Sequence, residues 1–190
     1  MSPADETVGR VLRFWFGPDG GRAGTERPEW FTADPAFDAA CRDALGAETE
    51  RALAGDLDDL VATPSGTLAL VVLLDQLPRN IHRGTAAAFA GDAAAKRVAE
   101  RLIDRGFDRV LTRVQRLFLY LPFEHSEDIE DQERAVALFE ALGHDGWLDY
   151  ARRHRDVIAQ FGRFPHRNEA LGRDSTEAER EFLADTGSGF

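Results

Sequence analysis

The feature that most constrains the fold is a helix-start signal that recurs along the chain. Three times a residue whose side chain can cap a helix is followed directly by proline, at Ser2-Pro3, Asp34-Pro35 and Thr63-Pro64. Such side chains accept hydrogen bonds from the free N–H groups of a helix start, and proline is tolerated there because its missing N–H has no helical partner. Capping boxes predict two more starts, Thr112 with Gln115 and Thr176 with Glu179, and further caps are expected at Asp92 and Ser126.

Apolar residues recur at helical spacing after these starts, and we expect about eight helices joined by short loops. The run from Leu68 to Leu74 also suits a buried strand, but the Thr63-Pro64 start and the helical neighbours favour a helix. Pro78 and Pro122 are expected to end helices. Because no convincing hairpin signal is present, the predicted fold class is all-α. The helices would pack as antiparallel pairs, in a bundle or a tetratricopeptide-like superhelix.

Length and composition narrow the class of protein. A chain of 190 residues is expected to form one domain over residues 1–184, with a flexible tail over residues 185–190. A net charge of −11 argues against a nucleic-acid partner. No apolar run approaches the roughly 20 residues of a membrane span, and the first residues do not resemble a signal peptide. With Cys41 as the single cysteine there can be no intrachain disulfide, so a cytoplasmic location is expected.

Two stretches carry an unusual combination of proline, arginine and asparagine, from Leu73 to Gly84 and from Phe161 to Arg173. Each follows a strongly apolar predicted helix. The second holds three arginines against one acid in a chain that is otherwise acidic. Arginine offers a rigid fork of N–H donors that binds carboxylate or phosphate in a bidentate manner. The two stretches therefore predict a polar site for an anion.

Asp75 lies on the apolar arc of its predicted helix, where an unpaired carboxylate would be costly to bury. Arg79 and Arg83, just downstream, are the expected partners. One interpretation is an internal salt bridge that holds the turn at Pro78. The other is that Asp75 orients an arginine whose remaining donors face a ligand. Both can hold together.

Three more ionisable groups stand out in the second half of the chain. His154 lies on an apolar helix face, where a histidine is more often a satisfied core residue than a functional one. Glu124 and His125 lie at a junction between two predicted helices, which suits either junction hydrogen bonding or an acid–base pair. A metal site from Glu124, His125, His154 and His166 is not favoured, because no spacing resembles a zinc signature. We expect no metal and no cofactor.

Several long strings of the chain resemble the uncharacterised bacterial family called domain of unknown function 924. They are RVLRFWFG, WFTADPAFD, LLDQLPRNIHRGTAAAFAGD, LFLYLPFEHSED and FGRFPHRNEALGRDSTEAEREFL. The resemblance covers nearly the whole chain and implies a tetratricopeptide-like helical fold, with no named activity. Its motifs also include Ser126 and Gln132 among their polar residues.

Two hypotheses about function follow. The first is a site, enzymatic or not, for a small anionic molecule, where Arg79, Arg83, Arg163 and Arg167 converge around His125. The candidate catalytic residues are His125, as acid or base, and Glu124, as its partner. The candidate ligand-binding residues are Asp75, Gln76, Arg79, Asn80, Arg83, His154, Arg163, His166, Arg167, Asn168 and Arg173. The second hypothesis is an adaptor that holds an acidic or carboxyl-terminal peptide in an arginine-lined groove. A third reading is that these groups only stabilise the fold.

Overall fold

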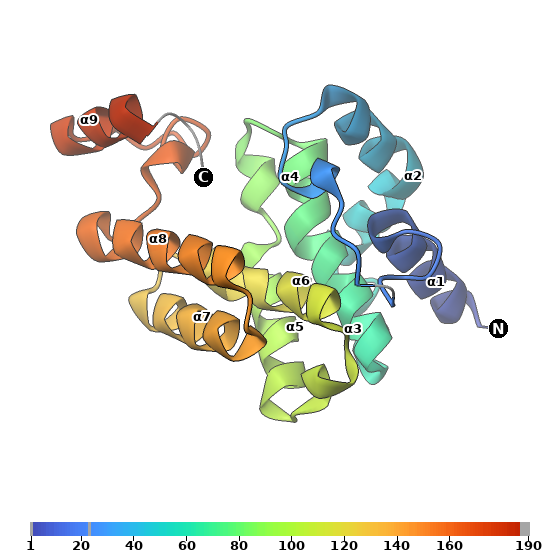
Figure 1. Ribbon diagram of the computed structural model, residues 1–190. Coiled ribbons are helices and arrows are strands. Elements are labelled where there is room, and N and C mark those ends of the chain that lie inside the picture. Colours follow the sequence, from blue (N-terminus) through green and yellow to red (C-terminus); the bar gives the residue numbers. More distant parts are fainter. Residues whose placement is uncertain (1, 23, 187–190) are drawn as a thin grey trace. The chain divides into compact units, whose positions relative to one another are not determined.

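The computed structural model describes residues 2–22 and 24–186, and every regular element in these two ranges is helical (Figure 1). This confirms the all-α fold class, with helix rather than strand over the apolar run at Leu68. Within that part of the chain, none of the helices has the length and apolarity that crossing a bilayer requires. The chain divides into two compact units. The first unit is Met1–Arg83 with Ala87–Pro122, and the second unit is Gly84–Ala86 with Phe123–Phe190.

Among the described helices of the first unit, those that begin where a capping signal predicts are α1 (Pro3–Phe16), α2 (Pro35–Leu53), α3 (Pro64–Val71) and α6 (Arg113–Glu124), of which α6 extends into the second unit. The unit also contains α4 (Leu77–Ile81) and α5 (Asp92–Asp104). Ser2, Asp34 and Thr63 each accept a hydrogen bond from a backbone N–H of the first turn that follows. The capping box of Thr112 and Gln115 is also formed.

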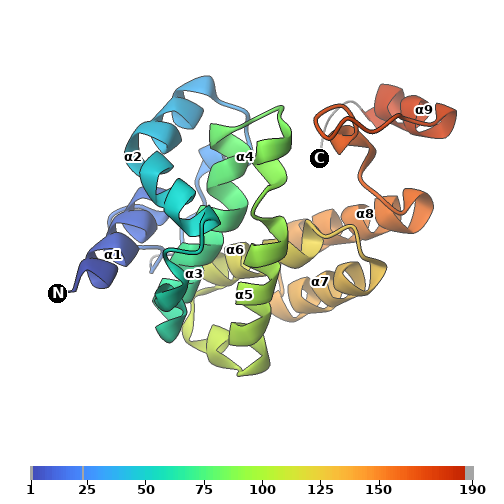
Figure 2. The same cartoon turned by 180° about the vertical axis from the view of Figure 1, so that it is seen from behind.

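The central helix of the first unit does not end at Pro78, so that prediction is wrong. α3 continues through a π-helical turn (Val72–Gln76) directly into α4, and residues 66–78 are all buried. In the π-turn the Leu77 N–H donates to the Val72 carbonyl, five residues back. Pro78 then occupies the first turn of α4, where a residue without an N–H is tolerated. This helix packs against α5 (Figure 2).

Three further local expectations are corrected. α6 runs past Pro122 to Glu124, since a proline this close to a helix end removes one hydrogen bond without stopping the helix. The cap that precedes Ile129 is Asp128, whose extended backbone brings its side chain to the Glu130 N–H, and not Ser126. Gly91 precedes α5, and Asp92 is the first residue inside that helix.

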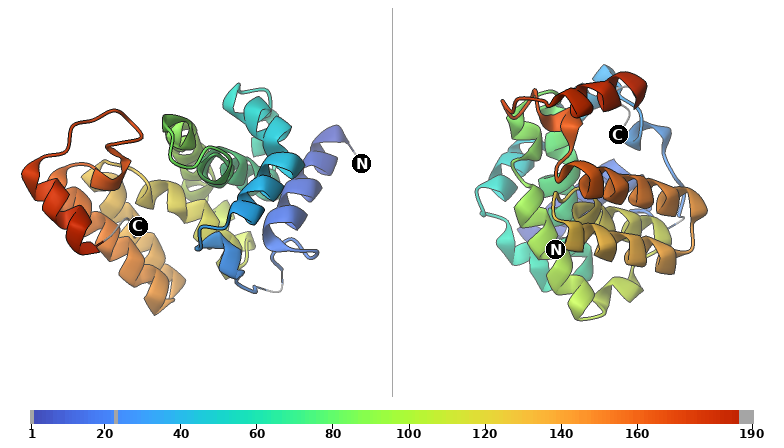
Figure 3. Two further views of the ribbon diagram at one scale, coloured as in Figure 1. Left: turned by 90° about the horizontal axis from the view of Figure 1, so that it is seen from above. Right: turned by 90° about the vertical axis from the view of Figure 1, so that its left-hand side faces the viewer.

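The second unit contains α7 (Ile129–Leu142), α8 (Asp145–Phe161) and α9 (Glu177–Thr186). α7 and α8 form an antiparallel pair that lies side by side in Figure 3. Gly143, with φ +69°, ends α7 and lets the chain reverse. α9 extends through residues 185 and 186 of the expected tail, whose remaining part, residues 187–190, lies outside the described residues. A tetratricopeptide-like superhelix stays a prediction.

Candidate functional site

The first proline–arginine–asparagine stretch lies in the first unit. Asp75 is fully buried, and Nη1 of Arg79 lies 3.2 Å from its Oδ1 and donates to its carbonyl at 2.7 Å. The Gln76 amide donates to the Oδ2 of Asp75 at 2.5 Å. Arg79 also binds Asp92 of α5 with two hydrogen bonds, of 2.7 and 3.0 Å. Burial opposes the charge on Arg79, but the neighbouring Asp75 and Asp92 outweigh it and raise the pKa of the guanidinium. The predicted contact between Asp75 and Arg79 is confirmed.

Arg83 forms its ion pair with Asp38 of α2 and not with Asp75. Its Nε and Nη2 donate to the two carboxylate oxygens of Asp38 at 2.7 and 2.8 Å, and Asn80 donates to the same carboxylate at 2.8 Å. The hydrogen bond from Arg83 lowers the pKa of Asp38, although partial burial acts against it. In this stretch the arginines join α4 to α2 and to α5. These contacts support the interpretation as internal salt bridges.

The second stretch lies in the second unit, and two of its arginines also hold carboxylates. Arg163 binds Glu179 at 2.6 and 2.9 Å, and this bond lowers the pKa of Glu179 to about 2. Arg173 binds Glu127 at 2.8 and 3.0 Å. Asn168, the asparagine of this stretch, is almost fully buried, and its side-chain amide donates to the Ser175 hydroxyl at 3.0 Å. These three residues attach the segment before α9 to the rest of the unit.

The third arginine, Arg167, has a different environment. It is only 6% exposed, its Nη2 donates to the carbonyl of His125 at 2.9 Å, and its guanidinium lies over the ring of Phe164, 4.5 Å from the centroid. The same ring is approached by the imidazoles of His154 and His166, each with its centroid 5.5 Å away. We call His125, His154, His166 and Arg167 the histidine–arginine cluster.

The pKa of His154 is strongly perturbed. Burial lowers its pKa to about 3, and the charges of His125, His166 and Arg167 act in the same direction. Its Nδ1 lies 2.9 Å from the carbonyl of Tyr150. Because a carbonyl can only accept, Nδ1 carries the proton, and the neutral ring then has its lone pair on Nε2. The Oε1 of Glu124, at the end of α6, lies 3.5 Å from the same Nδ1 of His154.

Gln132, which was not among the candidate site residues, stabilises the junction between α6 and α7 at Glu124 and His125. Gln132 of α7 is fully buried, and its amide nitrogen donates to the carbonyls of Glu124 at 2.6 Å and Ser126 at 2.7 Å. These two bonds fix the backbone on both sides of His125. The only sequence signal for this role is that Gln132 belongs to the family motif. A glutamine on an acidic helix would otherwise be expected to lie at the surface.

The structure therefore brings together five of the predicted site residues in the second unit. They are Glu124, His125, His154, His166 and Arg167. The set from Asp75 to Arg83 belongs to the first unit. Convergence of Arg79, Arg83, Arg163 and Arg167 involves residues of both units, and it stays a prediction. Among the described residues no three His, Cys, Asp or Glu side chains are grouped so that they could hold a metal ion.

The fold and the cluster define an all-helical protein with imidazole and guanidinium groups that are buried or partly buried in its second unit. The chain belongs to the family described as bacterial protein of unknown function (DUF924), whose model matches residues 11–187. It is similar to a protein of unknown function from Agrobacterium tumefaciens, ATU0120, whose solved structure has a TM-score of 0.86 and 39% sequence identity. That match covers 96% of this chain and 99% of the other. Comparison with the curated proteins gives no match. The resemblance noted in the sequence is confirmed.

Proposed function

We propose that the histidine–arginine cluster of the second unit binds a small anion, a carboxylate or a phosphate. The observation that carries the proposal is electrostatic. The imidazoles of His154 and His166 lie against the ring of Phe164, and Arg167 stacks on that ring and donates to the His125 carbonyl. Burial is the main cause of the lowered pKa of His154, and the charges of His125, His166 and Arg167 also disfavour a positive charge on it. Such a concentration of cationic and potentially cationic groups, in a chain of net charge −11, attracts a negative group.

The partners of Arg167 suit this role. A guanidinium that donates to the carbonyl of His125 and stacks on Phe164 is held in one orientation, and its charge also acts on the nearby carboxylate of Glu127. A guanidinium has its N–H donors in one plane, a geometry that matches carboxylate and phosphate oxygens. Arg163 forms an ion pair with Glu179, and Arg173 forms one with Glu127. In this proposal these two arginines stabilise the segment that carries Arg167 and do not contact the ligand.

The proposal includes acid–base chemistry at the helix junction. His125 lies in the turn after α6, and it exchanges a proton with the bound ligand. Glu124 lies beside the Nδ1 of His154 and orients the imidazoles of the cluster. His154 stays neutral near pH 7 because of its lowered pKa, and its Nε2 is a hydrogen-bond acceptor for a protonated ligand group.

A thermal-shift screen of phosphorylated and carboxylated metabolites tests the proposal. A ligand at 100 times its Kd adds about 2.7 kcal/mol to the free energy of unfolding. Arg167→Gln should abolish the shift. Arg152→Gln is the matched control, because it removes the same charge from a half-exposed side chain of α8 and should keep the shift. If no anion raises the melting temperature, or if Arg167→Gln responds like the wild type, the cluster is not an anion site.

A second candidate is an adaptor for an acidic or carboxyl-terminal peptide. It is favoured by the antiparallel pair α7 and α8, because stacked helix pairs of this kind build the concave surfaces of tetratricopeptide proteins. The same thermal-shift measurement with a peptide as the ligand separates the two candidates. A peptide ending in a free carboxylate that stabilises the protein, where free metabolites do not, would favour the adaptor.

A further inference from the structure

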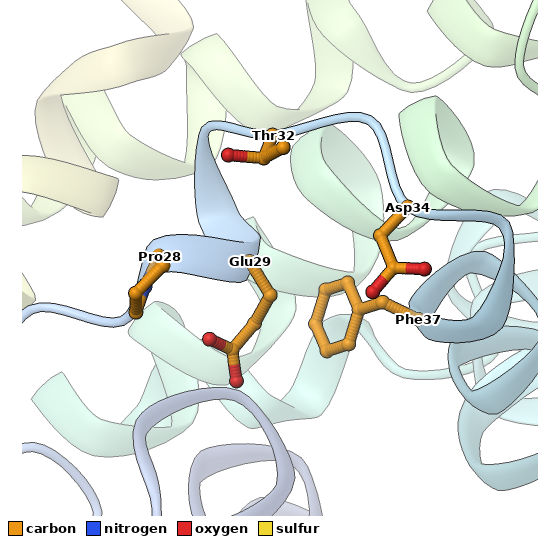
Figure 4. A pocket seen from close by; sticks show the side chains of 5 residues that line it. All are labelled: Pro28, Glu29, Thr32, Asp34 and Phe37. Atoms are coloured by element: carbon orange, nitrogen blue, oxygen red, sulfur yellow. The ribbon is translucent and has the colours of Figure 1, made fainter.

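The first unit also contains a hollow, in the segment that leads into α2. It has a volume of about 430 Å³, within the range of small-molecule sites, and it is lined by Pro28, Glu29, Thr32, Asp34 and Phe37 (Figure 4). None of these residues was a candidate site residue. Its chemistry is the opposite of the histidine–arginine cluster, because the lining contains two carboxylates and no cationic side chain.

Both carboxylates are held in place while one oxygen of each remains available. The Oε1 of Glu29 accepts a hydrogen bond of 2.5 Å from Arg27. Arg27 is itself anchored, because it donates to the carbonyls of Phe14 and Trp15 at 2.7 Å. The Oδ1 of Asp34 caps α2 through the Ala36 N–H at 2.8 Å. The two acids therefore keep their positions without a ligand, and each can offer its second oxygen to one.

An aromatic ring forms the wall between the two acids. In Figure 4 the ring of Phe37 lies between the side chains of Glu29 and Asp34. This ring stacks on Phe14, with centroids 6.0 Å apart and an interplanar angle of 8°, and it lies 5.9 Å from the ring of Trp15. A ring fixed from behind in this way presents π-electron density to the hollow, and that density attracts cations.

We propose that this hollow binds a small organic cation that carries N–H donors, a guanidinium or a primary ammonium group. Two carboxylate oxygens accept hydrogen bonds from such a group, and the Phe37 ring supports its flat or apolar side. The hydroxyl of Thr32 supplies a further acceptor at the rim. A quaternary ammonium ion would lack the hydrogen bonds to the acids, because it has no N–H to donate, and would keep only the attraction of its charge to the acids and the ring.

The test uses ethylguanidinium as the probe and follows backbone amide signals by NMR. We expect saturable shifts confined to residues 28–37, with a Kd on the order of 1 mM, which is typical of so small a ligand. Propionamide, a neutral molecule of similar size, and tetramethylammonium should each bind at least about tenfold more weakly. Shifts that do not saturate, or equal shifts with propionamide, would overturn the proposal.

Charge-neutral variants locate the site. Glu29→Gln combined with Asp34→Asn should weaken the probe at least about tenfold, and asparagine keeps the cap of α2. Asp43→Asn combined with Glu50→Gln removes the same charge from exposed positions of α2 and should leave the Kd unchanged. Glu29→Gln alone, which does not touch the cap, should also weaken binding. If the first and second double variants bind the probe equally, the cation is held by net charge and not by this hollow.

Discussion

Gly91, at the start of α5, lies directly against the carbonyl oxygen of Leu74 in the π-turn. A Cβ atom at Gly91 would be 2.0 Å from this oxygen, which is far inside van der Waals contact. The carbonyl belongs to the turn that precedes Pro78, and the residue four positions on, Pro78, has no N–H to donate to it. The close approach of α5 to the central helix therefore depends on a residue without a side chain.

Gly91→Ala should lower the free energy of unfolding by about 1–3 kcal/mol or more, because the added methyl group must displace backbone. Chemical denaturation measures this change. The matched control is Gly46→Ala in α2, where the nearest atom to the new Cβ is a side-chain carbon of Arg42 at 3.8 Å. That substitution should stabilise the protein by up to about 1 kcal/mol, since alanine favours a helix over glycine. Equal effects at the two positions would contradict this account of the α5 contact.

The ion pair made by Arg79 in α4 and the one made by Arg83, just after α4, should differ in strength. The side chains of Arg79 and Asp92 are each 20% exposed, whereas the side chain of Arg83, which pairs with Asp38, is 47% exposed. Double-mutant cycles should give a coupling free energy of about 1 kcal/mol or less for Arg83 with Asp38, because water screens that pair. The coupling for Arg79 with Asp92 should be clearly larger. A larger coupling free energy for the exposed pair would mean that burial does not decide which of the two ion pairs is stronger.

His154 should make the protein less stable as the pH falls. Its pKa is about 3 in the folded state and near 6.5 when unfolded, so between these values the unfolded chain binds more protons. The free energy of unfolding is therefore expected to rise with pH across this window. The contribution of His154 is fully present above its unfolded pKa, and its upper limit is on the order of 5 kcal/mol.

His154→Gln measures this contribution, because it removes the titrating group and keeps a polar side chain. Urea denaturation of the variant and the wild type at about pH 5 and about pH 7 should show a smaller pH dependence for the variant. Carboxylates contribute little to the difference, since both proteins share them. Parallel pH profiles would mean that His154 titrates near its ordinary pKa.

Gln132→Leu should loosen the junction around His125. The change removes the hydrogen bonds of the amide to the carbonyls of buried Glu124 and partly buried Ser126, which we expect to cost about 1–3 kcal/mol. Amide exchange should accelerate in residues 124–128. Glu133→Leu places the same side chain at the next, exposed position of α7 and should change stability by less than about 0.5 kcal/mol. Unchanged exchange in Gln132→Leu would show that the amide does not hold the turn.

Most helix starts could be predicted because the interactions that make them are local. The Thr176–Glu179 box joins residues three positions apart, and both of its hydrogen bonds are formed. Pro78 and Ser126 show where local rules fail. Whether a helix continues through proline depends on the carbonyls around it and on neighbours such as Gly91, which lies distant in sequence. Ser126 and Asp128 are both good caps, and the path of the chain between α6 and α7 selects Asp128.

By itself the sequence determined the all-α class, the family and the residue types from which a site could be built, since periodicity, caps and motifs are written along the chain. Only the tertiary structure decided which charges meet. Arg83 reaches Asp38 across 45 positions and Arg173 reaches Glu127 across 46. Arg167 came to lie among imidazoles and against Phe164 instead. The physical reason is that an arginine binds whatever acceptor the packing of helices brings within about 3 Å, and no local pattern records that choice.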